Sequence, residues 1–254
     1  MVEEIKKFSS YFKEFNDRYV LIGGAACFLV LNEVGLEYRE IKDIDVVLCL
    51  EEMNTEFAET FYDFFKFGRL KKTQMSREKE LFYRFYYTED EEFPYLFELF
   101  SSIPNVLMTF DGIHLNPVLV GEEQYNLSSV QIEEGYYNFI HSSKIYIDDI
   151  PTIPQETIIP LKAKALLDLI NRRDADETVD CDDIIKHKND IFRLLQIIDP
   201  DTRVALPDVI KGDIKQFLEL LKADPPKNLK PFGLVSTELG EIVNLIHTIY
   251  GLPA

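Results

Sequence analysis

Two aspartates separated by one residue, Asp43 and Asp45, are the clearest candidates for chemistry in this 254-residue chain. They open an apolar run, so we expect them at the start of a β-strand, where side chains repeat every two residues. Both carboxylates then point to one face and repel each other. A divalent cation with a preference for oxygen ligands, Mg²⁺ or Mn²⁺, relieves that repulsion. Such ions can clamp the attacking and leaving oxygens of a displacement at phosphorus.

A pair of glycines, Gly23 and Gly24, follows the short apolar segment 19–22, which we predict to be a buried strand. The next apolar segment, 25–34, is long enough for a buried helix. Without side chains at the turn, backbone N–H groups and the helix start can approach a phosphate closely. Strand, glycine turn, helix and Asp-x-Asp strand together fit transfer from a nucleoside triphosphate, in which positioning and charge neutralisation do most of the catalysis.

A third carboxylate is expected from a neighbouring strand. Glu98 is a lone acid in the apolar segment 95–100, and a buried acid needs a partner such as a metal ion. The segment 81–87 is also β-prone, and we predict that it pairs antiparallel with 95–100. Each signal has an ordinary alternative: a plain turn for the glycines, a surface strand start for Asp43 and Asp45, and a solvent-facing edge for Glu98. Their order in the chain favours a site.

The Ile-Gly-Gly turn and the segment Arg39–Asp45, with its order Arg-x-Ile-Lys-Asp-Ile-Asp before an apolar strand, resemble the minimal nucleotidyltransferase fold. Among its branches the closest resemblance is to the AbiEii-type family, known from the toxin half of certain bacterial toxin–antitoxin systems. Two features depart from the family pattern. Ile41 stands where Thr is usual, and 18 residues separate Gly24 from Asp43, which is more than is common.

The resemblance implies an enzyme that moves a nucleoside monophosphate from an NTP to an acceptor hydroxyl, with Mg²⁺ or Mn²⁺ as cofactor. It implies that Asp43 and Asp45 hold the metal, and that Glu98 completes the metal site or acts as a base. The residues it assigns to the nucleotide phosphates are Gly23, Gly24, Arg39 and Lys42. An antitoxin-like protein is the partner that such a family suggests.

Two lysines in the second half of the chain are further candidates for phosphate contacts. On a helix over 155–172, Lys162 projects into the apolar arc, whereas Lys164 projects away from it. On a helix over 180–198, Lys188 lies near the middle of the apolar arc that includes Ile185, and Asp190 lies on the opposite side. A lysine on a packed face must find an anion or extend its amine to solvent. Both lysines are therefore predicted to neutralise phosphates, with snorkelling as the alternative.

The fold class that these patterns indicate is α/β (α+β). Residues 1–150 are predicted to form a nucleotidyltransferase-like domain, a mixed sheet with flanking helices, which ends in a strand over 144–150. Residues 151–254 are predicted to form a helical bundle domain, with helices over 155–172, 180–198, 206–222 and 235–250. The prolines at positions 151 and 154 mark the boundary.

The charge and the cysteines exclude several classes of protein. The chain carries 27 Lys and Arg against 45 Asp and Glu, a net charge of −18, which excludes nucleic-acid coating by charge alone. Its three cysteines have no paired spacing, which excludes a disulfide framework and a zinc ribbon. No apolar stretch is long enough for a membrane span and no signal peptide opens the chain, so we expect a cytoplasmic protein without a membrane partner.

The acceptor is left open between two classes. The resemblance favours RNA, with the basic segments 71–72 and 77–84 as a candidate patch, although a solvated loop is the alternative for these residues. The acidic charge favours a cationic small molecule such as an aminoglycoside. A non-catalytic nucleotide-binding or interaction protein of the same fold is a third hypothesis.

Overall fold

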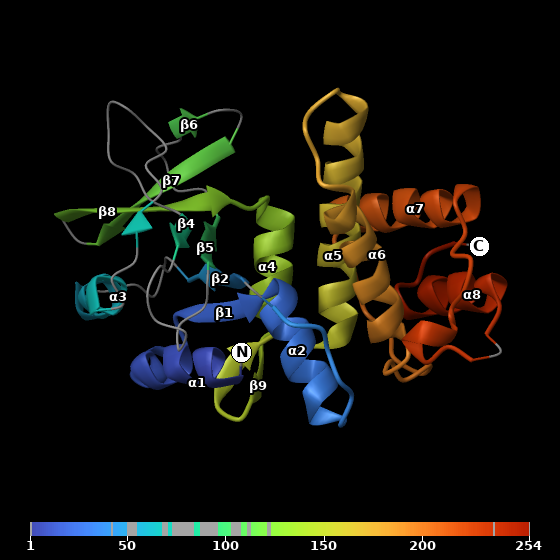
Figure 1. Cartoon of the computed structure of the whole chain (residues 1–254), viewed down its shortest axis with the longest axis horizontal. Coiled ribbons are helices and arrows are strands. Elements are labelled where there is room, and N and C mark those ends of the chain that lie inside the picture. The colour runs from blue at the N-terminus through green and yellow to red at the C-terminus, as the bar shows by residue number, and fades with distance from the viewer. Residues whose placement is uncertain are drawn as a thin grey trace. The chain divides into compact units, whose positions relative to one another are not determined.

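The chain divides into two compact units, Met1–Ile153 and Pro154–Ala254. The boundary lies three residues after the predicted one, which followed residue 150. The structure is a computed structural model and describes residues 2–41, 43–49, 55–67, 71–72, 84–86, 96–102, 108–110, 113–120, 123–235 and 237–253. The first unit contains a mixed sheet with flanking helices and the second consists of helices (Figure 1). Within the described residues, no helix combines the length and the apolar character that a membrane crossing requires.

The first unit alternates helices and strands. Its helices are α1 (Val2–Tyr11), the 3-10 turn η1 (Lys13–Phe15), α2 (Gly23–Glu33), α3 (Thr55–Phe67) and α4 (Glu134–Ser142). Its strands are β1 (Tyr19–Ile22), β2 (Asp43–Leu48), β3 (Lys71–Lys72), β4 (Arg84–Tyr86), β5 (Leu96–Ser101), β6 (Met108–Phe110), β7 (Ile113–Val120), β8 (Glu123–Gln131), β9 (Ile145–Ile147) and β10 (Ile150–Thr152). The described strands β1 to β8 form one mixed sheet, in the order β1-β2-β5-β8-β7-β6, with β4 pairing β5 and β3.

Strand β2 has two neighbours in this sheet. It runs antiparallel to β1 and parallel to β5. Strand β4 lies antiparallel against β5, which confirms the predicted pairing of the segments around 81–87 and 95–100. The segment 101–143, which carries no readable pattern, supplies the hairpin of β7 and β8 and the helix α4.

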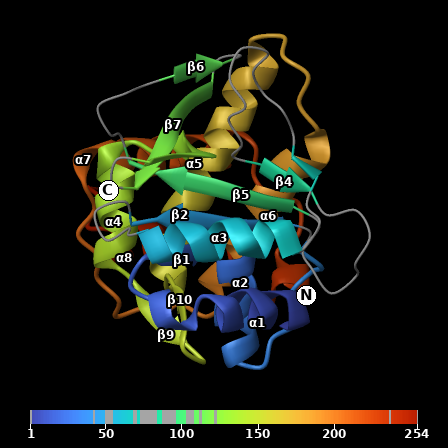
Figure 2. The same ribbon diagram turned by 90° about the vertical axis from the view of Figure 1, so that its left-hand side faces the viewer.

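An aromatic cluster fixes one face of the sheet. The Phe97 ring of β5 contacts Phe8 of α1 at 5.3 Å between centroids and Phe64 of α3 at 5.5 Å. Phe12 and Phe61 join α1 to α3 at 4.8 Å. Figure 2 shows α3 in front of the sheet and α1 below α3. Because side chains alternate along a strand, the face of β5 opposite Phe97 is the one that is left for polar side chains.

The prediction of a single strand over 144–150 is wrong. The structure has a hairpin there, in which β9 pairs antiparallel with β10 and Ile147 faces Ile150. The two residues between them, Asp148 and Asp149, have φ of 50° and 63°. Two consecutive left-handed residues make the tight turn that matches the twist of a hairpin, and Asp tolerates this conformation better than most residues.

The second unit consists of α5 (Gln155–Asp174), α6 (Cys181–Leu195), α7 (Asp208–Ala223), the 3-10 turn η3 (Lys230–Phe232) and α8 (Leu239–Ile249). Helix α5 packs against α6 and α7. The buried side chains that the helices share are Ile158, Ala163, Leu166, Ile191, Phe192, Ile214, Phe217, Ile242 and Ile246. The four predicted helices of this half are therefore confirmed, with ends that differ by a few residues.

Helix α5 contains a proline, Pro160, in its second turn. Proline has no N–H, so the carbonyl of Glu156, four residues earlier, lacks the helical hydrogen bond that it would normally accept. The hydroxyl of Tyr250, which follows α8 and is 1% exposed, donates to that carbonyl at 2.9 Å. This bond ties the end of the chain to the start of α5.

Candidate active site

The sheet register brings the three candidate acids onto one face. Asp45 of β2 is the direct partner of Glu98 of β5, and Asp43 lies two residues earlier on β2. Directly paired residues of neighbouring strands, about 4.8 Å apart, point to the same side of a sheet. Asp43, Asp45 and Glu98 are half-buried, whereas Ile44 and Phe97 on the opposite face are fully buried. The predicted common face is therefore present.

The glycine turn lies directly against one of these acids. Gly23 begins α2 immediately after β1, whose last residue, Ile22, is the register partner of Asp45. Gly23 has a φ of 62°, and a Cβ at this position would lie 2.9 Å from Cγ of Asp45 and would collide with the carboxylate. Glycine is needed here both for the left-handed backbone and for the close approach. The N-cap residue of α2, Ile22, has no side-chain capping hydrogen bond.

The second glycine adjoins the motif that precedes β2. A Cβ at Gly24 would collide with Ile41 and would lie 4.0 Å from Nη2 of Arg39. Arg39 also donates from Nη1 to the carbonyl of Glu40 at 3.2 Å and lies over the ring of Tyr38. The structure thus brings Gly23, Gly24, Arg39 and Asp45 together. Lys42, the other cation of the motif, lies outside the described residues.

A hard divalent cation suits these donors in chemistry and in backbone alignment. Three carboxylates on one face of adjacent strands are the oxygen set that Mg²⁺ prefers. The side chains are not gathered, however: among the described residues no group of three or more His, Cys, Asp or Glu is arranged to hold a metal ion. Metal binding by Asp43, Asp45 and Glu98 therefore requires rotation of their side chains, and it stays a prediction.

Lys162, the first of the two predicted phosphate ligands in the helical unit, already has an anion. Its Nζ lies 3.0 Å from Oδ2 of Asp190, and the two side chains are 4% and 0% exposed. Nη1 of Arg193 lies 3.4 Å from the other oxygen of Asp190. The placement of Asp190 on the polar side of its helix is therefore wrong. Apolar periodicity ignores ion pairs, and the ammonium on α5 is what makes burial of this carboxylate tolerable.

His187 borders this buried pair. Its Nδ1 is buried and has no hydrogen-bond partner among the described residues. Burial, followed by the positive charges of Lys162 and Lys186, lowers the pKa of His187 from 6.5 to about 3, although the carboxylates of Asp190 and Asp183 oppose the shift. The imidazole is therefore neutral in the folded protein at physiological pH.

Lys188, the second predicted phosphate ligand, lies at the surface of the helical unit. Its Nζ is 2.7 Å from Oδ2 of Asp224, whose side chain is 79% exposed. The hydrogen bond from Lys188 lowers the pKa of the Asp224 carboxyl. Ile185, predicted for the same apolar arc, is 53% exposed, because the buried part of α6 begins at Asp190. Phosphate binding by Lys162 and Lys188 stays a prediction, and each would have to exchange a carboxylate for a phosphate.

Three contacts of the structure were not predicted from the sequence. The pairing of Lys162 with Asp190 could have been found from the sequence, because a lysine in an apolar arc needs an anion and α6 supplies one. The contact between Cys49 and His141 could not be predicted from the sequence, because His141 lies in the segment 101–143, which carries no readable pattern. A register contact between Arg84 of β4 and Glu98 also depends on the sheet order alone.

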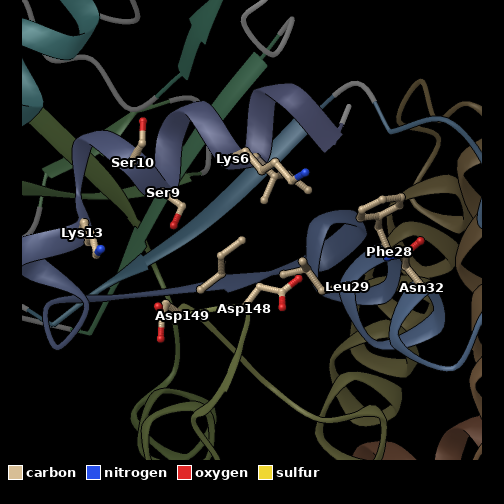
Figure 3. Close-up of a pocket in the computed structure, with 11 residues that line it drawn as sticks. Lys6, Ser9, Ser10, Lys13, Phe28, Leu29, Asn32, Asp148 and Asp149 are labelled. Carbon is tan, nitrogen blue, oxygen red and sulfur yellow. The ribbon is translucent and has the colours of Figure 1, made fainter.

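A cavity of about 420 Å³ lies between α1, α2 and the turn of the β9–β10 hairpin. Lys6 and Ser9 line it from α1, Asn32 from α2, and Asp148 and Asp149 from the turn (Figure 3). None of the candidate acids or glycines contributes to its wall. This cavity is therefore separate from the site around Asp45.

Comparison with known proteins finds no protein-family model and no curated protein that matches the chain. The solved structures to which the chain is similar include the following two. The antibiotic-resistance factor ANT(2'')-Ia is 12% identical with a TM-score of 0.41, and the alignment covers 87% of this chain and 95% of that one. The Megavirus polyadenylate synthase is 13% identical with a TM-score of 0.37, covering 88% of this chain and 36% of that one.

These likenesses concern the general arrangement of helices and strands. The chain spans little more than a third of the length of the viral protein. At these identities and TM-scores the comparisons assign no residue and no activity, so the site rests on the chain's own geometry. The chain has an α/β fold, a mixed sheet with flanking helices followed by a helical unit, with three acids on one face of the sheet beside a glycine turn.

Proposed function

We propose that the first unit binds a nucleoside triphosphate and that the protein transfers its nucleoside monophosphate to an acceptor hydroxyl, with release of pyrophosphate. The observation that carries this proposal is the position of Asp45, in register with Glu98 and in contact with the backbone at Gly23. Carboxylates beside the N–H groups of a helix start suit a metal–phosphate ligand, because the carboxylates bind the metal and the N–H groups bind the phosphate.

Each group has a role in this proposal. Asp43, Asp45 and Glu98 would hold Mg²⁺ or Mn²⁺, which when bound neutralises charge on the phosphate oxygens. Gly23 and Gly24 bring backbone N–H groups to the triphosphate, and the guanidinium of Arg39, beside Gly24, binds a phosphate oxygen. These residues position the nucleotide, which is most of what phosphoryl-type transfer requires of a protein.

We extend the proposal to the acceptor of the nucleotide and to a protein partner. The resemblance of residues 39–45 to the AbiEii-type family supports an RNA hydroxyl as acceptor, an antitoxin-like protein as partner and Lys42 as a phosphate contact. The position of Lys162 and Lys188 in the apolar arcs of their helices supports these two lysines as further phosphate contacts. A cationic small molecule as acceptor is the alternative that the net charge of −18 favours.

The test is label transfer from α-labelled NTPs, with Mg²⁺ or with chelator, to an RNA pool and to an aminoglycoside. We expect an Asp43→Asn, Asp45→Asn double variant to lose on the order of 10²-fold or more of the activity, the scale on which loss of one preorganised catalytic group lowers rates. Asp63→Asn is the matched control, because Asp63 is an exposed carboxylate on α3. Equal label transfer and equal NTP binding in the double variant and the wild type would refute the proposal.

Calorimetry with ATP, GTP, CTP and UTP separates catalysis from binding. Nucleotide binding that needs Mg²⁺ and depends on Asp45, without label transfer to any acceptor, would support the non-catalytic interaction protein instead. Transfer to the aminoglycoside and not to RNA would select the small-molecule alternative.

A further inference from the structure

A thiol and an imidazole meet within the first unit, away from the candidate acids. Sγ of Cys49 lies 3.2 Å from Nδ1 of His141 and 3.8 Å from its Nε2. Cys49 directly follows β2, and His141 lies in the last turn of α4, 92 residues later in the chain. A nucleophile within hydrogen-bond reach of a base is the arrangement that activates cysteines for chemistry. Because the sulfur is nearly as close to Nε2 as to Nδ1, it is not in line with the lone pair of either nitrogen, and the proton transfer proposed below includes a turn of the imidazole towards the thiol.

The fold holds both partners in place. The backbone N–H of Cys49 donates to the carbonyl of Arg18 at 2.9 Å, which ties the residue to the start of β1. The ring of Tyr137, one helical turn before His141, meets the imidazole edge-on with centroids 4.2 Å apart. The hydroxyl of Tyr137 donates to the carbonyl of Leu48 at 3.3 Å, so α4 is fastened to the end of β2 beside the thiol.

The helix terminus favours a positive charge on the imidazole, and that charge favours a negative charge on the sulfur against the burial of Cys49, which opposes it. His141 lies in the last turn of α4, where the helix dipole stabilises a cation. A cation beside a thiol stabilises its thiolate. The other charged groups nearby have partners of their own: Arg18 Nε lies 3.7 Å from a carboxylate oxygen of Asp17, and Lys144 Nζ donates to the Asp17 carbonyl at 2.9 Å. Tyr137 adds a phenol that is already hydrogen-bonded.

We propose that Cys49 and His141 form a nucleophilic pair and that Cys49 is a site of covalent modification by hydrogen peroxide. The imidazole takes the thiol proton, and the thiolate attacks one peroxide oxygen. An S–O bond forms and the O–O bond breaks, so the sulfur is oxidised to a sulfenic acid and the peroxide is reduced. The proton held by His141 passes to the leaving hydroxide, which departs as water. The proposal is independent of nucleotide transfer.

The two other cysteines are internal controls in the same chain. Cys27 is fully buried on α2, and Cys181 is exposed as the first residue of α6. Cys181 therefore reports an ordinary accessible thiol.

The first experiment measures the iodoacetamide alkylation rate of each cysteine between about pH 6 and pH 9, by mass spectrometry of peptides from the full chain. An ordinary thiol with a pKa near 8.5 gains roughly 200-fold in rate over this range. We expect that dependence for Cys181 and a change of less than about threefold for Cys49, since a thiolate is already formed at the lower pH. Burial of Cys49 slows entry of the reagent at every pH alike, so the ratio of rates is the readout, and burial also opposes the thiolate, so a flat profile requires the imidazolium to outweigh it. An equally steep profile at Cys49 would overturn the proposal and leave a plain S–H···N hydrogen bond.

The second experiment removes the base and adds the oxidant. His141→Gln should restore the steep profile at Cys49 and leave that of Cys181 unchanged; an unaltered flat profile would remove His141 from the pair. Peroxide followed by dimedone should label Cys49 in preference to Cys181 in the wild type. Preferential labelling of Cys181, or none at Cys49, would overturn the peroxide assignment even if the alkylation profile is flat. The wild-type measurements stand if the variant does not fold.

Discussion

The hydrogen bond from Tyr250 to the Glu156 carbonyl gives a sharp test of how the helical unit is held together. The carbonyl lies four residues before Pro160, which has no N–H to offer, so the tyrosine hydroxyl supplies the bond that the helix lacks. Tyr250→Phe removes only that hydroxyl. A polar group left unsatisfied away from water costs about 1–3 kcal/mol, and we expect the free energy of unfolding to fall by this amount.

Pro160→Ala provides the matched background for this change. Alanine restores an N–H that can bond to Glu156, so loss of the Tyr250 hydroxyl no longer leaves the carbonyl without a donor. In that background we expect Tyr250→Phe to cost only about 0.5–1 kcal/mol, close to the net value of one hydrogen bond. The difference between the two backgrounds is the coupling energy of the cycle.

Urea denaturation followed by far-ultraviolet circular dichroism measures all four proteins, since the second unit is helical. For a chain of this size each kcal/mol also moves the melting temperature by about 2–4 °C, which gives an independent readout. Equal costs of Tyr250→Phe in both backgrounds would refute the reasoning. The tyrosine would then contribute through its ring alone.

Three further outcomes follow from the described contacts. Asp190→Asn should lower the free energy of unfolding by about 3–5 kcal/mol, because it leaves the Lys162 ammonium buried without a counter-charge. The double variant Asp190→Leu, Lys162→Met should lower it far less, because no charge is then buried. Equal losses of the two variants in urea denaturation would contradict this reasoning. The pKa of His187 is lower in the folded chain, at about 3 against 6.5, so the unfolded chain takes up the proton first and stability falls as the pH drops from about 6.5 towards 3. His187→Gln should remove that part of the pH dependence, and an unchanged pH profile of stability would disprove the assignment. Gly23→Ala should destabilise more than Gly35→Ala, since both have positive φ but only Gly23 lies against another side chain; matching losses would mean that the contact costs nothing.

Residue order was enough to predict many of the elements and to name the candidate site residues, but not the elements of 101–143 or the β9–β10 hairpin. Apolar periodicity located the helices of the second half, and the Asp-x-Asp spacing placed Asp43 and Asp45 on one face of a strand. The glycine pair marked the turn at which α2 begins. These predictions succeed because they depend on local geometry, the two-residue repeat of a strand and the 3.6-residue repeat of a helix, which every segment carries in its own residue order.

Which distant groups meet depends on how the elements pack against one another. The parallel pairing of β2 with β5 put Glu98 beside Asp45, and the packing of α6 on α5 put Asp190 on Lys162. The contact of Cys49 with His141 depends on where α4 meets the end of β2. Strand order and helix packing are set by the burial of side chains from many elements at once, so no single segment encodes them.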